Sequence, residues 1–162
     1  MLFTIQTDEY DLPVYEQVMK LYDTIHKLTV KKTILSAYAL DGKGLAAAVS
    51  KMAFGNKLGV TIADEVSPEV LFAPGFGNIV VEVSQDKENE VKKTCFNAGL
   101  LKYVSIVGYV NDKQEFIFKQ TRILMEEALM AWQGTLENVF PTRAAETKET
   151  LDTDVYQGGQ VY

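Results

Sequence analysis

The stretch 39-ALDGKGLAAAVSKMAFG-55 leads from an expected strand into an alanine-rich helix through a turn bracketed by glycines. Two interpretations of the turn Asp41-Gly42-Lys43-Gly44 are open. In the first it holds a phosphate, with Asp41 binding Mg²⁺, Gly42 and Gly44 allowing close backbone approach, and Lys43 supplying charge. In the second the glycines only satisfy backbone angles that other residues avoid. The turn matches neither the P-loop nor the dinucleotide-binding fingerprint, which favours the second interpretation.

The segments next to this turn alternate between the two secondary structures. A strand is predicted over 32–40, a helix over 44–54 and a strand over 57–64. The helix before them, residues 11–30, carries an apolar stripe at spacings of three and four, with a start signal at Asp11. Its apolar positions are Val14, Val18, Leu21, Ile25 and Leu28.

The second half of the chain contains shorter patterns. Two strands are predicted on either side of 73-APGFGN-78, and a polar helix over 85–99 that ends near Gly99. The segments 102–110 and 114–120 flank Asn111-Asp112 and predict a hairpin. A last helix over 121–140 places Trp132 on a stripe with Met125, Leu129, Leu136 and Val139, which predicts that Trp132 is buried.

The predicted order of elements is α β α β β β α β β α. Strands that are close in sequence favour an α+β fold, with a split ferredoxin-like unit and extra helices, over a purely parallel sheet. We expect a lead-in over 1–10, a domain over 11–140, and a polar linker or draped tail over 141–162, where the periodic pattern stops.

Composition excludes several classes of function. The 162 residues include 16 basic and 22 acidic ones, for a net charge of -6, and therefore lack the basic surface that nucleic acids need. No apolar run is long enough for a membrane helix, and the N-terminus does not resemble a secretory signal. One cysteine and one histidine cannot build a Cys/His metal site, and we assign no metal ligand from the sequence. The single cysteine also fits a reducing, cytoplasmic compartment.

No complete catalytic set is visible in the sequence. Cys95 lies on the apolar stripe of a predicted helix, with no basic cluster placed to activate it, and is predicted to be a buried small hydrophobe. Glu126 and Glu127 are adjacent on a helix and point about 100° apart, so they do not converge on one substrate atom. We therefore assign no catalytic residue from the sequence.

Five ordered segments resemble phosphoribosylformylglycinamidine synthase over about residues 30–140. They are DGKGLAAAVS, KMAFGNKLGV (51–60), LFAPGFGNIVVEV, GLLKYVSIVGYV, and LMEEALMAWQGTLENV with Leu124, Trp132 and Thr135. The resemblance implies a domain similar to the C-terminal half of aminoimidazole ribonucleotide synthetase, with a layered α/β/α fold. The chain looks like the second such half of the enzyme.

The resemblance also implies a function. The family uses ATP, Mg²⁺ and glutamine to amidate formylglycinamide ribonucleotide in purine biosynthesis, with sites formed between domains and a separate glutaminase domain. This chain would contribute one wall of an auxiliary nucleotide site, with Asp41, Gly42, Lys43 and Gly44 as weak candidates, and would bind no cofactor tightly by itself.

The sequence departs from the family at the turn. When the chain is aligned on Gly44-Leu45, the metal-binding Asp of the family falls on Ala39 and its His on Tyr38, while its nucleotide-contacting Ser falls on Asp41. That Mg²⁺ contact cannot be carried over, although Asp41 could supply a carboxylate from two residues along.

Two alternatives stay open at this point. The chain could be a domain of a related ATP-dependent enzyme, of the selenophosphate synthetase or thiamine-phosphate kinase type. It could also be a ligand-binding α+β module without catalysis.

Overall fold

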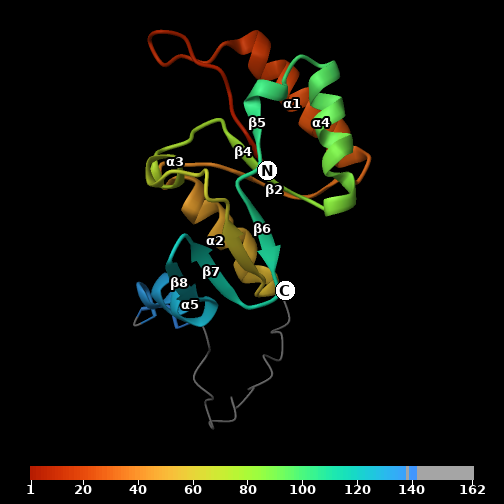
Figure 1. The fold of residues 1–162 in the computed structure, drawn as a ribbon. Coiled ribbons are helices and arrows are strands. Elements are labelled where there is room, and N and C mark those ends of the chain that lie inside the picture. The colour runs from red at the N-terminus through yellow and green to blue at the C-terminus, as the bar shows by residue number, and fades with distance from the viewer. Residues whose placement is uncertain (138, 142–162) are drawn as a thin grey trace, which may run out of the picture. The chain divides into compact units, whose positions relative to one another are not determined.

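The computed structural model describes residues 1–137 and 139–141 and divides the chain into two compact units, Met1–Leu129 and Met130–Tyr162. The first unit contains both sheets and four of the helices (Figure 1). The helices are α1 Tyr15–Val30, α2 Gly44–Asn56, α3 Pro68–Phe72, α4 Glu88–Asn97 and α5 Met125–Gly134, with short 3₁₀ turns at Gln85–Lys87 and Leu101–Tyr103. The predicted tail, residues 142–162, lies outside the described residues.

The first sheet is antiparallel throughout, in the order β2-β4-β1-β5. Its strands are β1 Leu2–Phe3, β2 Ile34–Ala39, β4 Ile79–Val83 and β5 Val104–Ser105. Neighbouring residues of a strand point to opposite faces, and each face has its own core. Phe3 and Val81 pack with α1 and α4, whereas Leu2 and Val80 pack with α2. Helices therefore cover both faces of the sheet, and the predicted layered α/β/α fold of the α+β class is confirmed.

The second sheet is mixed, in the order β6-β3-β7-β8. Its strands are β3 Gly59–Ile62, β6 Gly108–Asn111, β7 Glu115–Phe118 and β8 Thr121–Leu124. The predicted hairpin between the segments 102–110 and 114–120 is wrong, because β3 lies between β6 and β7 and pairs in parallel with β7. The hairpin is instead β7–β8, so the last helix begins at Met125 and not at residue 121.

The segment before the loop 73–78 is a helix, not the predicted strand. Ser67 caps α3, since its hydroxyl accepts the N–H of Val70 at 3.3 Å, and Pro68 begins the helix. Ser-Pro-Glu is typical of the N-terminus of a helix. The apolar residues that follow it led to the incorrect prediction of a strand.

The N-terminal segment also differs from expectation. Leu2 and Phe3, within the expected lead-in, form a central strand of the first sheet. Helix α1 begins at Tyr15 rather than Asp11, because Asp8 holds the chain in a turn by accepting the N–H groups of Tyr10 and Leu12, each at 2.9 Å.

Two further predictions about burial have opposite outcomes. Cys95 is fully buried between α4 and the first sheet, as predicted. The predicted burial of Trp132 is wrong, because α5 ends at Gly134 and this residue is 55% exposed. Within the described residues, no helix is long and apolar enough to cross a membrane.

Candidate functional site

The glycine turn connects β2 to α2, and Asp41 organises it. The Asp41 side-chain Oδ1 accepts the N–H of Lys43 at 2.8 Å. Its backbone carbonyl accepts the N–H groups of Gly44 at 3.2 Å and of Gly75 at 3.1 Å. One residue therefore closes the turn and ties it to the loop 73–78.

Gly44 is required by its backbone conformation and by its surroundings. Its φ is +71°, in the left-handed region, and a Cβ at this position would lie 2.4 Å from the carbonyl oxygen of Ala73. Gly42 has more room, since a Cβ there would meet only the ring of Phe76, at 3.5 Å. The space beside Gly44 is thus occupied by the backbone of the loop 73–78, and not left open for a phosphate.

The carboxylate of Asp41 is also engaged by a lysine. Its Oδ2 lies 3.7 Å from Nζ of Lys51, which donates to the hydroxyl of Tyr38 at 3.0 Å and lies 5.4 Å from the centre of that ring. The hydrogen bond from the Lys43 N–H and the charge of Lys51 lower the pKa of Asp41. The hydrogen bond to Tyr38 raises the pKa of Lys51. Both groups are therefore charged at neutral pH and face each other.

These contacts limit what the turn can bind. Gly42 and Lys43 are exposed and could meet an anion, but Asp41 adds negative charge beside them. No group of three or more His, Cys, Asp or Glu side chains suited to a metal occurs among the described residues. The hydroxyl of Tyr38 is engaged by Lys51, and the side chain of Ala39 has no ligand atom. A Mg²⁺ ion at this turn would need further ligands from outside it.

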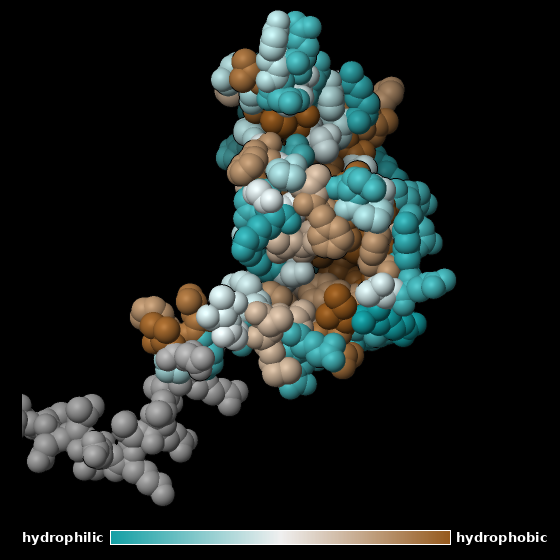
Figure 2. Space-filling view, turned by 90° about the vertical axis from the view of Figure 1, so that its left-hand side faces the viewer, coloured by the Kyte–Doolittle hydropathy of each residue, from teal (hydrophilic) through white to brown (hydrophobic). Residues whose placement is uncertain are grey.

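An exposed apolar strip lies next to the turn. We use the term strip for Tyr15, Met19 and Tyr22, at intervals of four and three along α1, together with Phe76. The hydroxyl of Tyr22 donates to the carbonyl of Gly77 at 2.8 Å, which brings the helix to the loop that carries Phe76. Figure 2 shows apolar residues reaching the surface among hydrophilic ones. Tyr15, Met19 and Phe76 are between 69% and 75% exposed, so this strip is open to solvent within the described residues.

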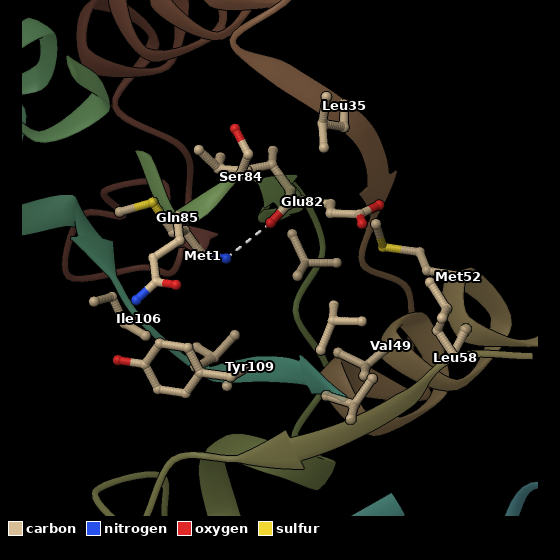
Figure 3. Close-up of a pocket in the computed structure, with 18 of the residues that line it drawn as sticks. Met1, Leu35, Val49, Met52, Leu58, Glu82, Ser84, Gln85, Ile106 and Tyr109 are labelled. Carbon is tan, nitrogen blue, oxygen red and sulfur yellow. Dashed lines mark hydrogen bonds between the residues drawn. The ribbon is translucent and has the colours of Figure 1, made fainter. Parts of the chain in front are cut away.

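The first unit also contains a cavity of about 440 Å³ that the sequence did not indicate. Its lining comes from β4, from α2, and from β3 and β6 of the second sheet (Figure 3). Since these elements are distant in sequence, only their packing creates the space.

Comparison with known proteins finds similarity both in sequence and in fold. No protein-family model matches the chain. The subunit PurL of phosphoribosylformylglycinamidine synthase from Carboxydothermus hydrogenoformans is 34% identical over 108 residues, which are 65% of this chain. The chain spans 14% of that relative.

Solved structures share the fold at low identity. The PurLQS structure from Thermotoga maritima matches with a TM-score of 0.63 and 12% identity, over 78% of this chain and 25% of that one. The HypE–HypF complex matches with a TM-score of 0.52 and 20% identity, over 64% of this chain and 40% of that one. The expected resemblance is therefore confirmed: this chain is similar in sequence to a segment of phosphoribosylformylglycinamidine synthase subunit PurL and shares its fold with domains of PurL and HypE.

Proposed function

We propose that this chain acts as one domain of a phosphoribosylformylglycinamidine synthase, which amidates formylglycinamide ribonucleotide with ATP, Mg²⁺ and glutamine. The sequence similarity to PurL over 108 residues carries the proposal. Because the chain spans 14% of that relative, the complete reaction would need further domains, including a glutaminase. Known PurL structures include complexes with ATP and with ADP, and an assembly named PurLQS.

Within such an enzyme, the chain would supply one wall of a nucleotide site between domains, in the position of the second synthetase half. The glycine turn and the strip support this role, because an exposed turn beside an unpartnered apolar surface suits a site that a second domain completes. The pairing of Asp41 with Lys51 at 3.7 Å supports an auxiliary role over a catalytic one, since each group already faces an opposite charge within the chain.

Calorimetric titration of the chain with ATP and Mg²⁺ tests the turn. We expect a millimolar dissociation constant that is indifferent to Mg²⁺ and weakens with salt, because an exposed lysine attracts phosphate only through screened charge. Lys43→Ala should remove this binding. Lys93→Ala, an equally exposed lysine on α4, should leave it unchanged. Low-micromolar binding that requires Mg²⁺ and is lost in Asp41→Ala would instead identify Asp41 as a metal ligand.

A chimera tests the domain assignment. The matched segment of the Carboxydothermus hydrogenoformans PurL would be replaced by the equivalent residues of this chain. We expect the chimera to keep ammonia-dependent amidation, whereas this chain alone should show none. A chimera that folds with its native oligomeric state but has lost ammonia-dependent amidation would contradict the assignment.

A further inference from the structure

The cavity between the two sheets has the size of a small-molecule site. Its volume of about 440 Å³ falls in the range of 300–1,000 Å³ that is usual for ligand pockets. It shares no residue with the turn Asp41–Gly44. A ligand in the cavity would therefore contact none of the residues of that turn.

The floor of the cavity is aliphatic. Val49 and Ala53 of α2, Val60 and Ile62 of β3, and Val80 of β4 are all buried and line it. Such a floor favours a ligand with an apolar body, because each buried apolar group leaves water on binding.

The edge of the cavity is polar and aromatic. Figure 3 shows Glu82 and Met52 on one side, and Gln85 and Tyr109 on the other. Tyr109 is 55% exposed, so its ring is accessible from solvent. An accessible aromatic ring attracts cations through the negative face of its π system.

The charges around the cavity are not balanced. Glu88 pairs with Lys92 at 2.6 Å, but Glu82 accepts its hydrogen bond from the neutral hydroxyl of Ser36, at 2.8 Å. Within the described part of the chain, no lysine or arginine forms an ion pair with Glu82. The Met1 ammonium donates to the carbonyl of Val81 at 2.8 Å. Burial lowers the pKa of this amine to about 6, although the charges of Glu88 and Glu82 oppose the shift, so the amine is mostly neutral above pH 7.

We propose that this cavity binds a small organic cation, with an ammonium group at Glu82 and an apolar, ring-sized body against the floor formed by α2 and β3. Apart from the Met1 amine, the half-buried Glu82 carboxylate has no cationic partner among the described residues. It attracts an ammonium more strongly than it would in water, since the lower local dielectric strengthens the attraction. Anionic ligands should bind more weakly, because the Glu82 carboxylate repels them.

Methyl NMR of the full chain with two matched probes tests the proposal. Tryptamine and 3-indolepropionate have the same ring and opposite charges. Of the five methionines, Met1 and Met52 line the cavity, whereas Met19, Met125 and Met130 do not and act as internal controls. We expect tryptamine to shift the Met1 and Met52 methyl signals and to bind at least about tenfold more tightly than 3-indolepropionate.

Two variants complete the experiment. Glu82→Gln should weaken tryptamine binding about tenfold. It should not weaken the binding of 3-indolepropionate, which should stay the same or become tighter. Glu65→Gln, an exposed glutamate that does not line the cavity, should change neither. Equal binding of both probes, shifts confined to Met19, Met125 and Met130, or no tryptamine binding to a folded chain would each overturn the proposal. Tyr109→Ala, at an exposed position, repeats the test should Glu82→Gln fail to fold, and should also weaken tryptamine binding.

Discussion

Replacing Gly44 by alanine should destabilise the domain strongly, because Gly44 begins α2 in a conformation that only glycine adopts easily. A non-glycine residue in the left-handed region costs about 1–2 kcal/mol. The new Cβ would also lie 2.4 Å from the Ala73 carbonyl oxygen, so the loop 73–78 must move. That movement weakens the hydrogen bonds from Gly75 to Asp41 and from Asn78 to Gly75, at about 1 kcal/mol each. The expected total is about 2–4 kcal/mol.

The same helix provides a matched control. Gly55 lies near the end of α2, and a Cβ there would meet nothing within 4 Å. Alanine is the better helix former, so Gly55→Ala should stabilise the protein by about 0.5–1 kcal/mol. The two variants make the same chemical change, and their effects should have opposite signs.

Urea unfolding followed by far-UV circular dichroism measures both variants. With a slope of about 2 kcal/mol per molar urea, Gly44→Ala should lower the midpoint by about 1–2 M, and Gly55→Ala should raise it slightly. A Gly44→Ala variant within about 0.5 kcal/mol of the unmodified chain would refute the reasoning. It would show that the loop 73–78 does not pack on the turn as described.

Three further predictions concern buried and exposed side chains. Phe3→Ala should cost about 3–5 kcal/mol in a urea titration, because Phe3 is fully buried in a central strand; a cost below 1 kcal/mol would show that β1 is dispensable. Trp132→Ala should cost less than about 1 kcal/mol by the same assay, since surface substitutions have small effects, and a larger loss would show that the indole is packed. Burial raises the pKa of Cys95 from 9.0 to about 11, so at pH 8 a thiol reagent should modify the native protein about 100-fold more slowly than the unfolded chain. Labelling of the native protein as fast as that of the unfolded chain would contradict the burial of Cys95. The raised pKa also contributes to the stability of the fold: this contribution is present below pH 9 and is lost as the pH rises towards 11.

Elements with a long local pattern were predicted from the sequence. The stripes of α1, α2 and α4 repeat over several turns, and each repeat adds to the same signal. The end of α4 is also local, because Gly99 has φ +68° at the position that follows the helix. Errors occurred where the pattern was short: a strand of two residues has no period, and the five residues of α3 look like an apolar strand.

The candidate site also has one part that could be predicted from the sequence and one part that could not. The glycines and Asp41 of the turn are adjacent, so the sequence indicated a special backbone there. The partners of Asp41 and Gly44 are Lys51 and the loop 73–78, which pack on the turn only in the folded chain. The cavity is still less visible in sequence, because its lining is drawn from both sheets and from α2.

Patterns of nearby residues were enough to predict the α+β class, the main helices, the buried thiol and the resemblance to phosphoribosylformylglycinamidine synthase. Three features became visible only in the folded chain: the central place of β1, the position of β3 between β6 and β7, and the contact of Asp41 with Lys51. Strand pairing and side-chain contact depend on which distant surfaces meet, and local sequence does not encode that. The residues next to a backbone N–H or a carboxylate do not specify its distant hydrogen-bond or ion-pair partner, because hydrophobic packing brings the two together.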